Sequence, residues 1–318
     1  GKGDGHRIAT ETQQRVRDAA DRLGYRRNQS ARSMRLGRSN AVGFLVASDH
    51  QFFGFSRHPR LVRGLAVGLN EYRNFLRLVV LDAGEQDPDV YLKQQFSELG
   101  VDGLVVSERT RLGDRLEAAM DRYRFPSIWA NVLREHDCVI PDETAAIQAL
   151  VREFAELGHR HIGYYDSGVN SHFSSVERRE AFDRMTNHGT GIRGSFVDVG
   201  HELPPQAKTA ELVNYFAAGD WPTAWIVVSG TRGQTLLWAA RECGLSVPQD
   251  LSIVALDDHN YDNVGLSLAF KRIPFMEVGQ IAAAMVQEKI ANPDVLLPPK
   301  RVAYGELHRG DSIAAARS

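Results

Sequence analysis

The sequence predicts an α/β fold in which two doubly wound parallel-sheet subdomains follow a short helical arm. From residue 41 onward, short apolar segments typical of buried strands alternate with longer amphipathic segments. This alternation runs through two rounds, and each round is long enough to form its own sheet. The chain has 318 residues, of which 43% are hydrophobic, so it can fill more than one core. Repeated alternation of this kind is typical of parallel sheets with helices on both faces.

The two rounds give the expected elements in order. In the first round the expected strands are 41–48, 75–83, 101–108 and 126–131, and the expected helices that follow them are 58–74, 89–100, 115–124 and 144–159. In the second round they are 161–167, 177–185, 194–200, 207–219, 224–229, 233–244, 251–258 and 278–291.

Polar side chains follow many of the expected strands. Ligands of such sheets bind at the carboxyl ends of the strands, so two facing subdomains would gather these side chains round a cleft. Carboxylates, hydroxyls and amides suit a hydroxylated or amine-bearing small molecule. For any single position the alternative is a polar strand end in contact with solvent. The residues concerned are Ser48, Asp49, Asp82, Ser107, Glu108, Asn131, Asp166, Ser167, Ser229, Asp257 and Asp258.

Positive charge is concentrated at the start of a chain whose net charge is -2. Residues 1–40 hold ten Lys and Arg against four Asp and Glu, whereas the remainder holds 28 against 36. This asymmetry is typical of an arm that binds a polyanion, joined to an acidic body. An arginine-rich, solvated tail is the alternative.

Two short helices are expected within this arm. Apolar residues at helical spacing predict a helix from Thr10, with Thr10 and Gln13 in the relation of a capping box and Gly24 as the stop signal. Its narrow apolar face needs a packing partner. A second basic helix over 28–36 carries Met34, and an inserted apolar side chain flanked by arginines is a known way to unstack a base step in the minor groove. Alternatively, Met34 packs on the body as part of a linker.

Catalytic and cofactor motifs are not apparent in the sequence. It contains no glycine-rich dinucleotide or phosphate loop, no nucleophile elbow and no zinc-protease motif. We interpret His159 as a helix C-terminal histidine favoured by the helix dipole and His161 as its surface neighbour, and Cys138 and Cys243 as buried thiols. We therefore expect no cofactor, no metal and no enzymatic activity. Without an apolar membrane span or signal core, a cytoplasmic location is expected.

A set of segments, in this order and spacing, resembles one known protein family. The segments are RIATETQQRVRDAADRLGYRRN, ARSMRLGRSNAVGFLV, GVDGLVV, LGHRHIGYY, SSVERREAF, DWPTAWIVVS, GLSVPQDLSIVALDD and LHRGDS. Together they resemble the lactose-repressor/galactose-repressor family of bacterial transcriptional regulators. The resemblance implies a helix-turn-helix headpiece, a hinge helix and a two-subdomain core similar to periplasmic binding proteins, assembled as a homodimer.

The resemblance also implies a DNA-binding segment. Residues 1–24 correspond to the end of the headpiece, so the recognition helix is expected upstream of residue 1. ARSM matches a hinge motif that normally ends in leucine, and Met34 would be the minor-groove wedge. Asn28, Arg32 and Arg35 would approach the DNA backbone or groove.

The effector pocket implied by the resemblance contains five matching positions. Arg178 corresponds to the arginine that holds polar groups of the ligand, and Asp257 to the acidic residue of the last pocket strand. Asn131 and Ser174 fall at further pocket positions, and Phe275 at an apolar platform.

Three departures from the family pattern concern the same pocket. Ser229-Gly230 stands where the family usually has Asn-Asp, and SLAF replaces the usual PLTT. The loop after the first strand is longer than usual and includes Phe53, which we add to the effector-binding residues together with Ser229. An aromatic, larger or anionic effector therefore becomes plausible beside a monosaccharide.

We therefore predict a DNA-binding transcriptional regulator, expected to be a repressor, whose core binds a small-molecule effector such as a sugar or another polar metabolite. The alternative is a solute-binding protein that delivers a ligand to a transporter. The expected domains are a headpiece remnant with hinge helix at 1–40, an N-terminal core subdomain at 41–140 and 275–302, and a C-terminal core subdomain at 141–274 and 303–318.

Overall fold

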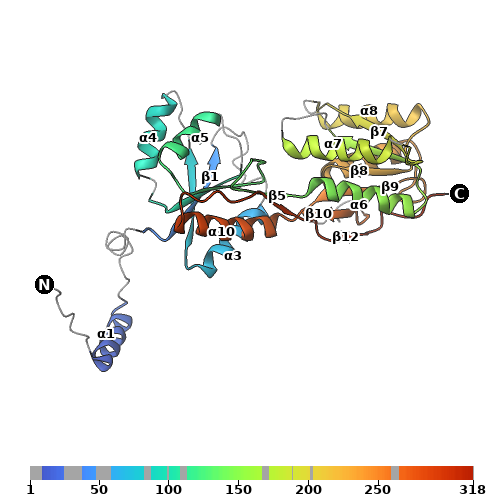
Figure 1. Cartoon of the computed structure of the whole chain (residues 1–318). Coiled ribbons are helices and arrows are strands. Elements are labelled where there is room, and N and C mark those ends of the chain that lie inside the picture. Colours follow the sequence, from blue (N-terminus) through green and yellow to red (C-terminus); the bar gives the residue numbers. More distant parts are fainter. Residues whose placement is uncertain are drawn as a thin grey trace.

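The fold of the chain was analysed in a computed structural model. Two six-stranded sheets follow each other along the molecule, and helix α1 (Thr10–Arg22) precedes both (Figure 1). Within the described residues, no helix combines the length and the apolar character that a membrane span requires. The structure describes residues 9–24, 38–47, 59–81, 87–98, 100–107, 113–166, 172–187, 189–200, 203–258 and 265–317.

The first sheet has strands from both ends of the core. These are β1 (Ala41–Ala47), β2 (Phe75–Leu81), β3 (Gly103–Val106), β4 (Ser127–Ala130), β5 (Cys138–Pro141) and β11 (Lys300–Val302). Their order is β2-β1-β3-β4-β5-β11, and every neighbouring pair is parallel. Because the chain winds outward in both directions from β1 and β3, this is the doubly wound arrangement predicted.

Among the described residues, four helices cover the first sheet. They are α3 (Pro59–Glu71), α4 (Pro88–Glu98), α5 (Gly113–Arg122) and α10 (Phe275–Ala291). Helices α4 and α5 lie on one face, and α3 and α10 lie together on the other (Figure 1). Glycines allow α3 and α10 to approach closely: a Cβ on Gly64 would lie 2.0 Å from the Met276 carbonyl oxygen, and one on Gly279 would lie 2.2 Å from that of Leu61.

The second sheet repeats this topology. It contains β6 (His161–Asp166), β7 (Arg193–Asp198), β8 (Ala224–Val227), β9 (Ser252–Asp257), β10 (Ala269–Arg272) and β12 (Leu307–His308). The order is β7-β6-β8-β9-β10-β12. The first five strands are parallel, whereas β12 pairs antiparallel with β10, which the strand–helix alternation did not predict. Such an antiparallel edge strand on a parallel sheet is common in this class of fold.

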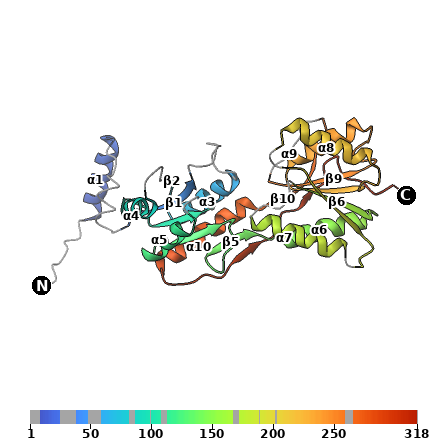
Figure 2. The same cartoon turned by 90° about the horizontal axis from the view of Figure 1, so that it is seen from above.

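Helices cover the two faces of the second sheet in pairs. These are α6 (Glu143–Glu156) with α7 (Phe173–Thr186), and α8 (Pro205–Ala217) with α9 (Gly230–Glu242). Figure 2 shows the two pairs on opposite sides of the strands. Phe154 and Phe182 fill the core beneath the first pair, and Leu212 and Leu236 the core beneath the second. The helix expected at 177–185 is α7, which begins four residues earlier than expected, at Phe173.

The chain passes between the two sheets three times. The crossovers run from β5 to α6, from β10 to α10, and from β11 to β12. Hydrogen bonds join neighbouring crossovers: the Asp142 N–H donates to the Val302 carbonyl at 2.8 Å, and the Gly305 N–H donates to the Arg272 carbonyl at 2.9 Å. The three crossovers therefore form one connected hinge region between the lobes.

The N-terminal helix differs from expectation at its start. The predicted helix is present, but Ala9 is its N-cap and no side chain caps it, so the capping box of Thr10 and Gln13 is wrong. Its end agrees with the prediction, because Gly24 takes a left-handed φ of +62° just after the last turn. The apolar side chains Val16 and Leu23 are 63% and 83% exposed, so the apolar face of α1 is open to solvent.

Candidate functional site

Two of the predicted effector residues meet at the N-terminus of α9. Ser229 is the N-cap of this helix, and its Oγ accepts a hydrogen bond from the Arg232 N–H. The buried Asp257, at the end of β9, accepts hydrogen bonds from the N–H groups of Gly230 at 2.7 Å and Asp258 at 2.8 Å. A carboxylate is stabilised at a helix N-terminus, where N–H groups and the helix dipole favour negative charge.

Arg178, the predicted ligand-binding arginine, is part of a buried polar ring. Its Nε–H donates to Oε2 of Glu143 at 2.6 Å, and its Nη2–H donates to Oη of Tyr304 at 2.9 Å. The Tyr304 hydroxyl in turn donates to Oε2 of Glu143 at 2.6 Å. Arg178 is 9% exposed and Glu143 only 1%, whereas Tyr304 is half-buried, so the ion pair at the centre of this hydrogen-bonded unit is shielded from water.

Burial and charge together fix the protonation states in this ring. Burial alone would lower the pKa of Arg178, but the adjacent Glu143 carboxylate raises this pKa well above its usual value. Burial, assisted by the same carboxylate, raises the pKa of the Tyr304 hydroxyl well above its usual value. Arg178 is therefore a cation and Tyr304 a neutral phenol.

The ring lies at the hinge between the sheets. Glu143 opens α6 immediately after the first crossover, Tyr304 belongs to the third crossover, and Arg178 lies on α7. The arginine predicted to touch the effector thus contacts the third crossover directly and the residue that immediately follows the first crossover.

Asn131 and Ser174, the other two predicted polar contacts, are joined by His172. Asn131 follows β4 with a left-handed φ of +63°, a conformation that asparagine tolerates. Its carbonyl accepts from Nε2–H of His172 at 3.1 Å, and Nδ1 of His172 accepts from the N–H of Ser174 at 3.3 Å and from its Oγ–H at 2.7 Å. Since a carbonyl only accepts and a backbone N–H only donates, the imidazole is neutral with its proton on Nε2. The carboxyl end of β4 therefore meets the N-terminus of α7 through one side chain.

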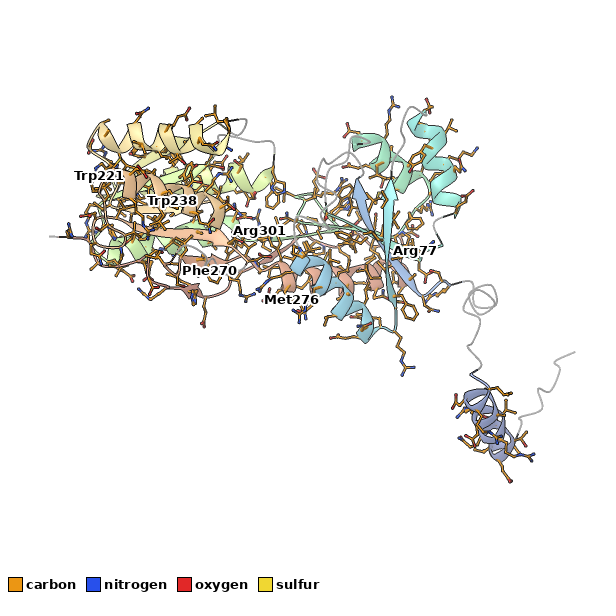
Figure 3. All side chains as sticks on the ribbon, turned by 180° about the vertical axis from the view of Figure 1, so that it is seen from behind. Arg77, Trp221, Trp238, Phe270, Met276 and Arg301 are labelled. Atoms are coloured by element: carbon orange, nitrogen blue, oxygen red, sulfur yellow. The ribbon has the colours of Figure 1, made fainter. Side chains whose placement is uncertain are left out.

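A further contact between the lobes involves the residue next to Arg178. Glu177 on α7 accepts two hydrogen bonds from Arg301 on β11, at 2.7 and 2.8 Å. This hydrogen bonding raises the pKa of Arg301. Figure 3 shows Arg301 where the lobes adjoin. The N-terminal half of α7 thus binds the first sheet at two points and the crossovers at a third.

The remaining predicted residues are placed differently or not described. Phe275, at the start of α10, is 6% exposed and packs within the apolar core. Phe53 and the proposed DNA-contacting Asn28, Arg32, Met34 and Arg35 lie outside the described residues, so the structure does not test them. The strand-end residues Ser48, Asp49, Asp82, Glu108 and Ser167 also lie outside.

The structure corrects our interpretation of two histidines. His159 is 2% exposed, and its ring contacts the Thr223 hydroxyl at 2.9 Å and the Ala314 carbonyl at 3.0 Å. Burial lowers its pKa, so it is a neutral core residue and not a charged helix terminus. His161 is half-buried, and its Nε2 contacts the Ser195 hydroxyl at 2.8 Å. Of the two thiols, Cys138 is buried as predicted and Cys243 only partly so.

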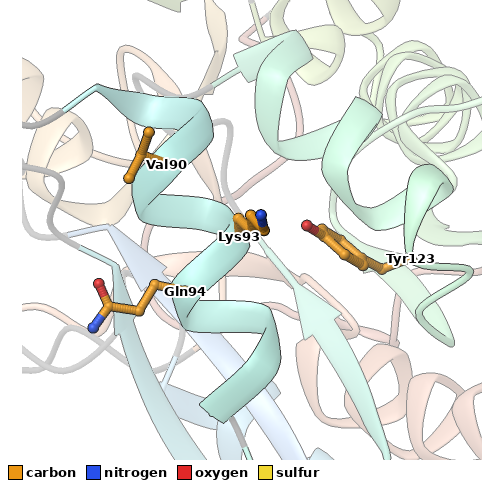
Figure 4. A pocket seen from close by; sticks show the side chains of 4 residues that line it. All are labelled: Val90, Lys93, Gln94 and Tyr123. Atoms are coloured by element: carbon orange, nitrogen blue, oxygen red, sulfur yellow. The ribbon is translucent and has the colours of Figure 1, made fainter.

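One hollow on the surface lies away from these residues. It has a volume of about 340 Å³ and lies between α4 and α5, where Val90, Lys93, Gln94 and Tyr123 line it (Figure 4). Of the predicted effector residues that the structure describes, none lines it. Within the described residues, no group of three or more histidine, cysteine, aspartate and glutamate side chains could hold a metal ion.

Sequence reasoning missed Glu143, Tyr304 and His172. Glu143 follows the N-cap Asp142, where an acidic residue is expected simply because it favours the helix dipole. Tyr304 and His172 lie in segments without a periodic pattern. No signal local to these positions indicates that they meet Arg178 and Asn131, which are distant in sequence.

Comparison with known proteins agrees with this architecture. Residues 151–313 match the periplasmic binding protein-like domain family. The chain is 24% identical over 303 residues to the HTH-type transcriptional regulator PtxS of Pseudomonas plecoglossicida, covering 94% of this chain and 86% of that protein. It is 33% identical over 184 residues to the maltose regulon regulatory protein MalI of Escherichia coli strain K12, covering 56% and 50%.

A solved structure extends the likeness to the fold. The lac repressor dimer bound to operator and the anti-inducer ONPF superposes with a TM-score of 0.74 at 16% identity, over 97% of this chain and 92% of that one. The doubly wound lobes, the triple crossover and these matches lead to one assignment. The chain belongs to the periplasmic binding protein-like domain family and, within it, to the lactose-repressor/galactose-repressor transcriptional regulators.

Proposed function

We propose that the core of this regulator binds a small effector where α7 and α9 begin, and that occupancy of this site controls operator binding by a homodimer of the complete protein. The observation that carries the proposal is the position of Arg178 on α7, where it contacts both the first residue of α6 and Tyr304 of the third crossover. A relative of solved structure is a dimer that holds both an operator and an anti-inducer, which supports the same set of partners here.

The proposed effector contacts are those expected from the sequence. Polar groups of the ligand meet Arg178 and Asp257, and the ring of Phe275 or Phe53 provides an apolar wall. We propose the full set as Asn131, Ser174, Arg178, Ser229, Asp257, Phe275 and Phe53. The proposed lobes are 41–140 with 275–302, and 141–274 with 303–318.

The proposed mechanism is a shift between two lobe arrangements. A ligand changes such an equilibrium only by its difference in affinity for the two states. Contacts from α7 to both lobes make that difference possible, since a ligand bound beside Arg178 and Asn131 is sensitive to the distance between the lobes. In the dimer, the lobe arrangement would set the spacing of the two hinge segments on DNA.

The proposed DNA contacts are Asn28, Arg32, Met34 and Arg35 of the segment at 1–40. We expect Met34→Leu in the complete protein to keep operator affinity and Met34→Ala to lose much of it, because the wedge needs apolar volume between base steps. The affinity should fall as salt rises. Equal operator binding by both variants would contradict the role of Met34.

The effector site is tested by a thermal-shift screen of sugars, nucleobases and organic acids, because a ligand specific for the folded form raises the melting temperature. We expect Arg178→Lys and Asp257→Asn to lose the shift, since the lysine lacks the planar fork of donors and the asparagine lacks the charge. Arg179→Lys is the matched control, because Arg179 pairs with Asp198 instead. Retention of the full shift in both site variants would refute the assignment.

We propose that the protein acts in the cytoplasm and catalyses no reaction. Its curated relatives are transcriptional regulators, which also disfavours the solute-binding alternative. The excess of positive charge at 1–40 also supports a role on DNA, because DNA is a polyanion.

A further inference from the structure

The charge of Arg178 is already compensated inside the protein. Glu143 accepts from Nε at 2.6 Å and Tyr304 accepts from Nη2 at 2.9 Å, while the hydroxyl of Tyr304 donates back to Glu143. Nη1 has no hydrogen-bond partner among the described residues. An approaching ligand would thus meet N–H donors of a guanidinium whose positive charge is balanced by a carboxylate.

Displacing Glu143 from this ring is unfavourable. The carboxylate is 1% exposed, and removing its partner would leave a buried charge without compensation. Tyr304 could not replace Arg178, because it is a neutral phenol with a single O–H donor. A ligand therefore joins the ring at its open donors and leaves the ion pair intact.

Other charges around the site are also paired or negative. Arg179 pairs with Asp198 and Arg301 with Glu177. Arg232 approaches the Ser229 hydroxyl at 3.5 Å and is the cation of the site without a carboxylate contact among the described residues. Three strand-end aspartates, Asp166, Asp257 and Asp258, are also buried.

We propose that Glu143 is a specificity-determining residue that restricts the group bound by Arg178 to an uncharged acceptor, such as a hydroxyl, carbonyl or amide oxygen, and disfavours carboxylate and phosphate. The inference rests on the proposed effector site and narrows its ligand class, since sequence reasoning left an anionic effector open. Hydrogen bonds from a charge-neutralised guanidinium retain their direction but lose most of the attraction for an anion.

The first experiment does not need the natural effector. Sodium formate is titrated against the complete protein at constant ionic strength, balanced with sodium chloride, while the melting temperature is recorded. In Glu143→Ala the formate carboxylate can occupy the vacated position beside Arg178, so formate should raise the melting temperature by at least about 2 °C. Wild type should show no formate-specific rise.

Two control variants locate the response. The double variant Glu143→Ala with Arg178→Met should not respond to formate, because no cation remains. Glu177→Gln frees Arg301, a partly exposed arginine, and should not acquire the response. If Glu143→Ala does not fold, Glu143→Gln replaces it; formate should then bind at the open donors of Arg178, because the amide leaves the cation uncompensated.

The second experiment compares matched neutral and anionic probes, glucose with gluconate and ribose with ribose 5-phosphate. In wild type we expect any Arg178-dependent shift to come from the neutral member, and in Glu143→Gln the anionic member should gain. A wild-type shift by gluconate or ribose 5-phosphate that Arg178→Lys abolishes would overturn the proposal, as would a folded Glu143→Ala protein indifferent to formate. If Glu143→Ala responds to formate but none of the four matched probes shifts the melting temperature, the result would count against the proposed effector site and not against the role of Glu143.

Discussion

Glu177 and Arg301 form a two-fold hydrogen-bonded ion pair, with distances of 2.7 and 2.8 Å, between helix α7 of one lobe and strand β11 of the other. Arg301 is 41% exposed and Glu177 17%, so water reaches one side of the pair. Because the two residues belong to different lobes, the pair favours the lobe arrangement described above.

Breaking this pair should change the lobe arrangement more than the stability. We expect Arg301→Gln to lower the free energy of unfolding by less than about 1 kcal/mol, as is usual for partly exposed pairs. The radius of gyration from small-angle X-ray scattering should nevertheless change, since one of the direct links between the lobes is lost. Arg184→Gln, which breaks the exposed pair with Glu180 within α7, is the control. An unchanged scattering profile for Arg301→Gln would show that the pair does not hold the lobes.

Buried Tyr164 and half-buried Tyr304 should respond differently to loss of the hydroxyl. Tyr164 is fully buried, and its Oη has no hydrogen-bond partner among the described residues. Tyr164→Phe should leave stability unchanged or raise it by up to about 1 kcal/mol, because an unsatisfied polar group is removed. Tyr304→Phe should lower it by about 1–3 kcal/mol, because Arg178 and Glu143 each lose a partner. Urea unfolding measures both, and equal effects would contradict the contrast.

Buried His159 should make the protein less stable in weak acid. Burial lowers its pKa below the ordinary imidazole value of 6.5, so the unfolded chain binds a proton more readily than the folded one. The contribution is complete above pH 6.5 and is lost as the pH falls from there toward the lower folded pKa. His159→Gln should flatten this part of the stability profile.

His161 titrates in the same direction, because burial also lowers its pKa. His161→Gln is therefore measured in parallel by urea unfolding between pH 7.5 and pH 5. The slope lost in each variant assigns the share of each histidine, and an unchanged slope in both would refute the prediction.

Close packing of α3 on α10 should not tolerate a methyl group at Gly64. The added Cβ would lie 2.0 Å from a backbone oxygen of Met276, and a backbone cannot move aside as a side chain can. We expect Gly64→Ala to destabilise the protein by about 1–3 kcal/mol, despite the better helix propensity of alanine. Gly200→Ala is the control, since its Cβ would make ordinary contacts with Leu203. A wild-type denaturation midpoint for Gly64→Ala would contradict the model of packing.

The periodic parts of the fold could be predicted, and the contacts across it could not. Apolar segments such as 41–48 and 251–258 predicted strands, because a strand buried on both faces has a continuous apolar run. In contrast, the antiparallel pairing of Leu307 with Lys271 depends on where a crossover delivers the chain. The capping box at Thr10 failed because the helix begins there, with Ala9 as the cap.

The candidate site shows the same division. The resemblance singled out Arg178, Asp257 and Ser229, and the structure brings the latter two together at one helix end. The resemblance could not indicate Glu143 or Tyr304. Glu143 is 35 positions from its partner Arg178, and Tyr304 is 126 positions from Arg178. Such partners depend on tertiary geometry and leave no periodic trace in the sequence.

The triple passage of the chain between lobes has a consequence for synthesis on the ribosome. Helix α10 and strand β11 complete the first lobe, yet they are translated only after the whole parallel part of the second sheet. Until then the nascent first lobe lacks α10, which packs on α3, and β11, which pairs with β5 at the sheet edge. The uncovered apolar surface and the unpaired strand groups are available to chaperones or to aggregation. The lobe whose translation begins first therefore completes its folding late. A chain that terminates before residue 275 would contain a first lobe without α10 and β11.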